Sequence, residues 1–412
     1  MNTRLSYHQA CDPRAAAAPM ARHFGLDPEV CFLNHGSFGA TPLEVRARQD
    51  EFRALMEREP VRFFVEEAEP LLDEARAAMA AFVGCDADDF AFVANATAGV
   101  NTVVRSLRFA AGDEVLTSSH EYNACNNAVA AALEPWGGRL VSVALPFPVR
   151  NEDEIVDALL AGVTPRTRLV LLSHVTSPTG IILPVKRMVA LLAAQGIDTL
   201  VDGAHAPGYL PLDVASLGCA YYTGNFHKWV CAPKGSAFLY VRRDRQPLIR
   251  PLIVSHGANS PRTDRPRFRL EFDYVGSTDL SAWLATPAAV AFVGKLHANG
   301  WPGVMAANRD LAIAARDLLC RRLGAQPPVP DSMLGAMAAV PIAPRPAEPR
   351  GGWSMVYQDP LWDRLTSNWG IQVPIWAFPA PPQRHVRISA QVYNRIEQYE
   401  YLAEAIAAEG GE

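Results

Sequence analysis

The segment Tyr222-Thr223-Gly224-Asn225-Phe226-His227-Lys228-Trp229 decides the fold class, together with Val201-Asp202-Gly203-Ala204-His205 upstream. In each segment a polar residue follows an apolar run that is typical of a buried strand. Asp202 ends the first run, and Lys228 follows the second run 26 residues later. Ligands of open α/β sheets lie beyond the carboxyl ends of the strands. We therefore expect Asp202 and Lys228 to face the same site.

The chain around these segments alternates between strand-like and helix-like runs. The predicted strands are 90–94, 114–118, 140–145, 168–175, 199–202, 220–223 and 236–241, and the predicted helices are 98–107, 123–133, one from about 152, and 184–194. Thr41-Pro42-Leu43-Glu44 is typical of a capping box with Pro at the first helical position, and it predicts a helix through Arg58. This alternation predicts an α/β fold with a mostly parallel sheet covered by helices.

The pattern changes after about residue 281. Two long helices are predicted there, one through about 297 and one from 302 to 322, followed by a Pro-rich loop at 341–349. A strand at 386–389 and a closing helix complete the prediction. We therefore expect three parts: an N-terminal segment 1–40 that lines the site, a large α/β domain 41–280, and a smaller α+β domain 281–412.

Composition limits the class of protein. The chain has 412 residues and a net charge of −5, which does not favour a role at nucleic acid or at a membrane surface. No apolar run reaches the roughly 20 residues of a membrane helix. Seven scattered cysteines form no C-x-x-C pair, so reduced thiols in the cytoplasm are favoured over disulfides or a metal site. We expect a cytoplasmic protein without a bound metal.

The lysine and the aspartate predict the chemistry of the site. Enzymes that use pyridoxal phosphate (PLP) need a lysine to hold the aldehyde as a Schiff base and a carboxylate to keep the pyridine nitrogen protonated. Alone each signal is weak, because strand-ending acids often cap helices and His-Lys pairs are usually on the surface. Asn95-Ala96-Thr97-Ala98-Gly99 adds a strand-to-helix turn whose free N–H groups suit a phosphate. Tyr122 offers a ring to stack on a flat cofactor, and the hydroxyls of Thr176 to Thr179 offer donors to its ring oxygen.

The chain resembles the PLP-dependent fold type I enzymes, in the aminotransferase class V branch, and is most similar to the isopenicillin N epimerase-like group. The motifs that carry this resemblance lie in order along about residues 30 to 400. They are Leu33-Asn34-His35-Gly36-Ser37-Phe38-Gly39-Ala40-Thr41-Pro42, Asn95-Ala96-Thr97-Ala98-Gly99, Val201 to Gly208, Gly224 to Trp229, and Val386-Arg387-Ile388-Ser389.

The resemblance implies a role for each matching residue. Lys228 would carry the Schiff base and move the Cα proton, and Asp202 would pair with the pyridine nitrogen. The other implied cofactor contacts are Ala96 and Thr97 at the phosphate, Asn225 and His227 at further phosphate positions, Tyr122 stacked on the ring, and Ser177 and His205 near the ring oxygen. Arg387 would clamp the substrate carboxylate, since a guanidinium binds carboxylates through two parallel hydrogen bonds, while Asn34, His35 and Ser37 would line the substrate side. Thr278, in Gly276-Ser277-Thr278, would reach the phosphate of a neighbouring subunit, which implies a homodimer.

One departure from the family pattern disfavours one class of reaction, desulfuration through an enzyme-bound persulfide. Cysteine desulfurases of this branch carry a nucleophilic cysteine shortly before the carboxylate-binding arginine, and here Val373 to Ala380 contains none. The main expectation is an epimerase or racemase that acts on an amino acid or an amino-acid-derived compound. The alternatives are a C–S β-lyase similar to hercynylcysteine sulfoxide lyases, a transaminase, and a PLP-binding sensor without turnover. The cluster Arg262, Arg265, Arg267 and Arg269 predicts either a solvated loop or a pocket for a second substrate carboxylate.

Overall fold

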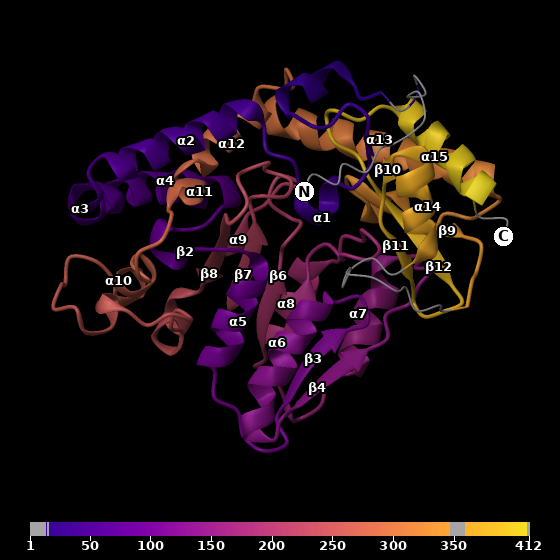
Figure 1. Ribbon diagram of the computed structural model, residues 1–412. Helices are drawn as coiled ribbons and strands as arrows, with labels where there is room; N and C mark the ends of the chain where they lie inside the picture. Colours follow the sequence, from indigo (N-terminus) through magenta and orange to yellow (C-terminus); the bar gives the residue numbers. More distant parts are fainter. Residues whose placement is uncertain (1–13, 15, 347–358, 410–412) are drawn as a thin grey trace.

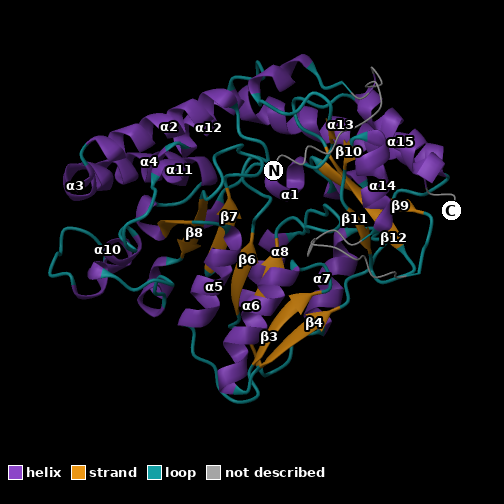
Figure 2. Cartoon of the chain, viewed as in Figure 1, coloured by secondary structure: helices purple, strands orange, loops and turns teal. Residues whose placement is uncertain are grey.

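A central sheet organises the fold. The computed structural model describes residue 14 and residues 16–346 and 359–409, and within this part of the chain the sheet has seven strands in the order β2-β8-β7-β6-β5-β3-β4 (Figures 1 and 2). Neighbouring strands from β4 to β7 are parallel, whereas β8 is antiparallel to both β7 and β2. The strands are β2 Phe90–Val93, β3 Glu114–Ser118, β4 Arg139–Val143, β5 Thr167–Ser173, β6 Asp198–Asp202, β7 Tyr221–Asn225 and β8 Ala237–Val241. The predicted mostly parallel sheet is confirmed.

Both faces of this sheet are covered, as β5 shows. Its side chains alternate between the two faces, because successive residues of a strand point in opposite directions. Leu169 and Leu171 pack in one apolar cluster with α5 and α6, whereas Val170 and Leu172 pack in another with α7 and α8. These helices are α5 Ala96–Ser106, α6 Asn123–Leu133, α7 Glu152–Ala161 and α8 Val185–Ala193, and the short α9 Val214–Leu217 precedes β7. Burial on both faces explains why the strands are nearly continuous apolar runs.

A layer of helices flanks the β2 side of the sheet (Figure 1). It contains α2 Leu43–Arg58, α3 Pro60–Arg62, α4 Ala68–Val83, α11 Ser281–Leu284 and α12 Thr286–Gly294, and α10 Arg267–Phe272 lies nearby. The predicted helix from 281 is divided at Ala285, because Pro287 in the first turn of α12 cannot donate an N–H. The predicted capping box is wrong: Pro42 is the N-cap of α2, and the Thr41 hydroxyl donates instead to the Ala232 carbonyl at 3.1 Å.

The smaller C-terminal domain is built on an antiparallel sheet in the order β11-β12-β9, with β9 Met337–Ile342, β11 Ile375–Ala377 and β12 Arg384–Ser389. Its helices are α13 Gly300–Leu323, α14 Pro360–Trp369 and α15 Ile396–Glu409. The predicted loop at 341–349 overlaps β9 through Ile342, and its residues 347–349 lie outside the described residues. The bounds of the three predicted parts stay a prediction.

The N-terminal segment is integrated into this smaller domain. Strand β1, Cys31–Phe32, pairs in parallel with β10, Ile371–Gln372, and the short helix α1, His35–Phe38, follows directly. Gly39 ends α1 with φ +70°, and a Cβ there would lie 2.1 Å from the His227 carbonyl oxygen. The segment therefore packs against the loop that carries Lys228. None of the described helices has the length and apolarity that crossing a membrane requires.

Candidate cofactor and substrate site

A cavity of about 430 Å³ lies at the carboxyl ends of the central strands. The sequence-predicted residues that line it are Ser37, Ala96, Thr97, Tyr122, Ser177, Asp202, His205, Asn225, His227 and Lys228. The remaining lining residues are Phe38, Asn95, Ser173, Val175, Ala204 and Trp376. Parallel strands place their carboxyl ends along one edge of the sheet, and so residues distant in sequence meet there.

Lys228 supplies the reactive amine of this cavity. It lies in the turn between β7 and β8, and its Nζ is 3.1 Å from His205 Nε2. Burial lowers the pKa of Lys228 to about 8, and the nearby Arg387 charge adds to this effect, while Asp202 opposes it. A lowered pKa increases the fraction of neutral amine near physiological pH, which is the form that acts as a nucleophile or base.

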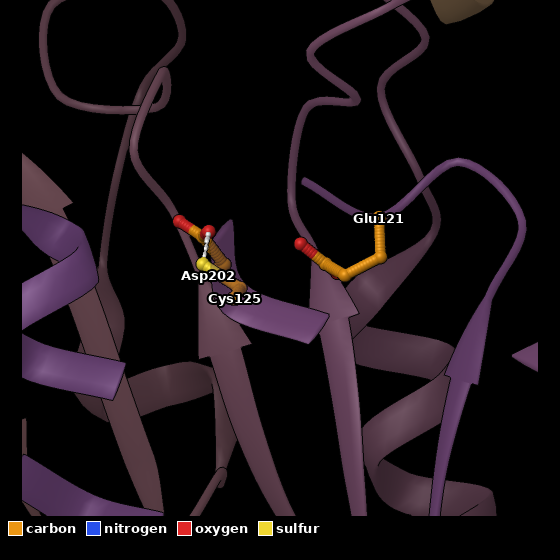
Figure 3. Close-up of side chains that lie close together, drawn as sticks. All are labelled: Glu121, Cys125 and Asp202. Atoms are coloured by element: carbon orange, nitrogen blue, oxygen red, sulfur yellow. Dashed lines mark hydrogen bonds between the residues drawn. The ribbon is translucent and has the colours of Figure 1, made fainter. Parts of the chain in front are cut away.

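Asp202 ends β6 and lies close to two other buried side chains, as Figure 3 shows. Its Oδ1 accepts from the Ala204 N–H at 2.9 Å, and its Oδ2 accepts from the Cys125 thiol at 3.1 Å. Glu121 points toward the same place, with its carboxyl held by the Ser173 hydroxyl and the Tyr122 N–H. Burial, and then the Asp202 carboxyl, raise the pKa of Glu121 above its usual range. The site can therefore keep Glu121 protonated beside an Asp202 carboxylate.

The ligand atoms of Glu121, Cys125 and Asp202 lie within 4.8 Å of one another, a spacing at which a metal ion could be held. A cysteine binds metal as the thiolate. Burial raises the pKa of the Cys125 thiol well above its usual value, and the thiol donates a hydrogen bond to Asp202. The arrangement therefore suits a hydrogen-bonded carboxylate better than a metal site.

The N-terminus of α5 lines the cavity where the sequence predicts the phosphate. Asn95 caps this eleven-residue helix by accepting from the Ala98 N–H at 2.8 Å, and Asn225 Oδ1 accepts from the Ala96 N–H at 2.8 Å. Among the described residues the Thr97 N–H has no hydrogen-bond partner. Thus the Ala96 N–H, expected at the phosphate, is occupied by Asn225, and Thr97 remains as the free donor at a helix N-terminus.

His227 also lines this cavity. Its Nδ1 is 3.0 Å from the Ser236 carbonyl, which can only accept, so Nδ1 carries a proton and Nε2 is the available nitrogen. Burial, followed by the Lys228 charge, lowers the pKa of His227 to about 4, while the hydrogen bond to Ser236 opposes this shift.

Arg387 of β12 contacts three residues that line this cavity, Ser37, Ser177 and Trp376. Its side chain is only 1% exposed. Nη2 donates to Ser37 Oγ at 2.9 Å and to Asn34 Oδ1 at 3.3 Å, and Nη1 donates to the Ser177 carbonyl. The guanidinium lies over the Trp376 ring, 4.7 Å from its centroid. Arg387 therefore lies behind Ser37 and Trp376, at the boundary between the two domains.

Four predicted site residues do not line this cavity: Asn34, His35, Thr278 and Arg387. Asn34 and Arg387 each hydrogen-bond the lining residue Ser37. His35 is fully buried, and its ring joins the Lys228 carbonyl at 3.0 Å to the Tyr393 hydroxyl at 2.6 Å, so it supports the lysine loop and does not line the substrate side as expected. Thr278 lines a second cavity with Gly276, Arg262 and Arg265. Its predicted role toward a neighbouring subunit stays a prediction.

The sequence analysis gave no role to Glu121, Cys125 and Trp376, whose side chains contact predicted or lining residues of the site. Glu121 precedes Tyr122, and Cys125 lies one helical turn into α6, so both could have been found from their spacing to Tyr122. Trp376 lies in the segment 373–380, where the absence of cysteine was the only signal considered. The predicted second carboxylate pocket at Arg262 to Arg269 is not favoured either, because these side chains are ion-paired or hydrogen-bonded. Arg262 pairs with Glu69 at 2.7 Å, and Arg269 pairs with Asp88 at 3.1 Å.

The residues that are present fit PLP. A partly buried amine and a buried carboxylate lie at the ends of neighbouring parallel strands, and a capped helix offers a free N–H to the same cavity. On this sheet, such a site defines a PLP-dependent enzyme of fold type I.

Comparisons with known proteins agree. The family model described as aminotransferase class-V matches residues 41–299. The chain is 36% identical over 403 residues to isopenicillin N epimerase of Streptomyces clavuligerus, covering 94% of this chain and 96% of that protein. It is 31% identical over 407 residues to the probable chloroplastic L-cysteine desulfhydrase of Arabidopsis thaliana, covering 92% and 83%. The chain belongs to the aminotransferase class V family, and its cofactor is pyridoxal phosphate.

Solved structures confirm the fold. The cystine C–S lyase C-DES, in complex with cysteine persulfide, superposes with a TM-score of 0.73 at 21% identity, over 91% of this chain and 97% of that one. The cysteine desulfurase CsdA of Escherichia coli superposes with a TM-score of 0.72 at 21% identity, over 95% and 97%. The predicted fold type I architecture is therefore confirmed.

Proposed function

We propose that this enzyme abstracts the Cα proton of an amino acid or an amino-acid-derived compound, with Lys228 as the base, and returns a proton as an epimerase or racemase. The observation that carries the proposal is the partly buried Lys228 amine, whose pKa is lowered to about 8, in a cavity that Asp202 also lines. A base works best when its pKa lies near the working pH. The 36% identity to isopenicillin N epimerase over nearly the whole chain supports this choice of reaction.

Each residue group has a separate task in this proposal. PLP, when bound, supplies an electron sink for the negative charge that develops at Cα. Asp202 holds the proton of the ring nitrogen, and the Thr97 N–H at the start of α5 holds the phosphate. Arg387 would orient the substrate carboxylate. Lys228 then moves the proton between the substrate and its own Nζ.

A C–S lyase is the second candidate, because relatives of two kinds support it. The chain is 31% identical to a probable L-cysteine desulfhydrase, and a cystine C–S lyase shares its fold. A lyase starts from the same loss of the Cα proton. It needs no thiol of its own, and the lining of the cavity includes no cysteine.

The experiment that separates these candidates is incubation with a panel of amino acids in deuterated water. An epimerase incorporates deuterium at Cα and inverts configuration, which mass spectrometry and chiral chromatography detect. A lyase releases pyruvate and ammonia, a transaminase converts the cofactor to its amine form, and a sensor does neither. The matched control is Lys228→Ala, which should lose most exchange, since acid–base groups typically supply about 10²–10⁴-fold. Equal exchange by Lys228→Ala would refute the role of Lys228.

We also propose a homodimer in which Thr278 reaches the neighbouring subunit's site. Strongly exposed apolar side chains support an interface: Val61, Val65, Ile253 and Val254 are 78%, 75%, 60% and 64% exposed. The test mixes Lys228→Ala subunits with Thr278→Trp subunits. If Thr278 acts across the interface, one site of each hybrid dimer regains both native residues, and activity returns. No recovery in confirmed hybrids would place Thr278 in its own subunit's chemistry.

A cytoplasmic location is proposed as well. The described cysteines Cys31, Cys85, Cys125, Cys219, Cys231 and Cys320 are all free thiols, which a reducing compartment maintains. Fractionation of the native host should recover the activity with the cytoplasmic markers, and recovery in an oxidising compartment would refute the location.

A further inference from the structure

Two buried side chains, Trp229 and His205, form a line of hydrogen bonds that ends at the Lys228 amine. Trp229 Nε1 donates to His205 Nδ1 at 3.3 Å, and His205 Nε2 lies 3.1 Å from Lys228 Nζ. Trp229 and His205 are 1% and 2% exposed, so water does not compete for these contacts. An indole N–H donates and never accepts. His205 Nδ1 must therefore be the accepting nitrogen.

The tautomer of His205 follows from this contact. A neutral imidazole carries one proton, so a ring that accepts at Nδ1 has its hydrogen on Nε2. The other tautomer would point two N–H groups at each other across 3.3 Å. His205 stays neutral, because burial, followed by the Lys228 charge, lowers its pKa well below the usual range. The Nε2–H of His205 thus points at Lys228 Nζ.

We propose that Trp229 is a positioning residue that fixes the Nε2–H tautomer of His205, so that His205 donates to Lys228 and keeps its amine neutral. An ammonium group has no lone pair and cannot accept a hydrogen bond, whereas a neutral amine can. The donated hydrogen bond therefore stabilises the form of Lys228 that acts as nucleophile and base. This inference rests on the proposed role of Lys228, but the tautomer itself is measurable whatever reaction the enzyme catalyses.

Packing holds the indole in the orientation that this role requires. The Trp229 ring meets the Tyr209 ring edge-on at 5.0 Å and the His35 ring at 5.0 Å. Tyr209 is itself fixed, since its hydroxyl accepts from the Met337 N–H at 3.1 Å. The charged and titratable groups that act on the pair are Asp202, Cys125, Arg387, His35 and His227. Arg387 acts in the same direction on Lys228 as the donated hydrogen bond, and Asp202 acts against it.

The first experiment measures the tautomer directly in the cofactor-free protein. With ¹⁵N-labelled histidine, the resonances of His205 are identified as those lost in His205→Gln. We expect Nδ1 in the unprotonated range and Nε2 in the protonated range. In Trp229→Phe, which keeps an aromatic ring but has no N–H, we expect mixed or reversed tautomers. A protonated Nδ1 in the unmodified protein would overturn the proposal, without bearing on whether the enzyme is an epimerase or a lyase.

The second experiment measures the neutral fraction of Lys228. In the cofactor-free protein, trace acetylation over a range of pH modifies only neutral amines. Mass spectrometry reports each lysine separately, with Lys234 as an internal reference. In Trp229→Phe the midpoint of the acetylation curve of Lys228 should rise by about one pH unit. At a pH below the midpoint, the fraction of neutral Lys228 should then be about tenfold lower. The matched control is Trp283→Phe, because the Trp283 indole donates to the Gly235 carbonyl at 2.9 Å, away from the amine. An unchanged midpoint in folded Trp229→Phe would overturn the proposal.

Discussion

Replacing Arg387 should weaken amino-acid binding while leaving the cofactor bound. The guanidinium is buried, and three acceptors around it, Ser37 Oγ, Asn34 Oδ1 and the Ser177 carbonyl, fix its plane. A substrate carboxylate would therefore bind a guanidinium whose orientation is already fixed. A hydrogen bond to a charged group contributes about 1.5–3 kcal/mol, so Arg387→Ala should raise the apparent Kd about ten- to a hundredfold. Arg387→Lys should recover part of this loss, because it restores the charge and not the fork.

The assay follows the cofactor absorbance during titration with the amino acid that gives the strongest response in a screen. The matching amine without a carboxylate serves as a second ligand, and Arg387→Ala should bind the two with similar affinity. Arg384→Ala is the control variant. It lies on the same strand, pairs with Asp359 at 2.9 Å, and should lower stability without changing the apparent Kd. An unchanged preference for the carboxylate in folded Arg387→Ala would refute the clamp.

Three further predictions follow from the site and the core. Asp202→Asn should lower the rate of Cα hydrogen exchange far more than the cofactor occupancy, and equal exchange at equal occupancy would show that ring protonation does not need Asp202. Cysteine should give no stable enzyme-bound persulfide, and mass spectrometry that finds one forming at the rate of turnover would restore desulfuration. His120, whose ring nitrogens have no partners among the described residues, has its pKa lowered by burial to about 4, so the unfolded chain binds its proton first as pH falls. The stability that neutral, buried His120 contributes is fully present above about pH 6.5. The free energy of unfolding then falls by about 3 kcal/mol as the pH is lowered to 4. His120→Phe should therefore flatten the acid limb of urea unfolding between pH 7.5 and 4.5, and an unchanged acid limb would contradict this.

The large domain could be predicted closely because its strands are buried on both faces. Apolar runs such as Leu169 to Leu172 have a single interpretation when both faces pack against helices. The end of β7 was missed, since Gly224 and Asn225 do not resemble a strand, yet the antiparallel partner β8 extends the ladder to Asn225. Short strands such as β1 and β10 have no periodicity to detect, and their pairing depends on contacts between distant parts of the chain.

The site, like the fold, contains residues that could be predicted from the sequence and residues that could not. Residues at strand ends, such as Asp202 and Lys228, were predicted because strand position alone brings them together. His35 was assigned to the substrate side from its motif, whereas its contacts with the Lys228 carbonyl and Tyr393 depend on how the smaller domain packs. Which ring nitrogen of His205 carries the hydrogen could not be predicted from the sequence either, because it depends on the direction of one indole N–H.

The pairing of the N-terminal segment with the smaller domain has a consequence for biosynthesis. The Gly36 N–H binds Ser389 Oγ across 353 residues, and the Ser389 N–H binds the Leu33 carbonyl. Such distant contacts form late, because the intervening chain must be made and closed first. On the ribosome, Asp202 and Lys228 emerge well before Arg387. The growing chain therefore contains Lys228 before it can complete the contacts of Arg387, the residue proposed to bind the substrate carboxylate.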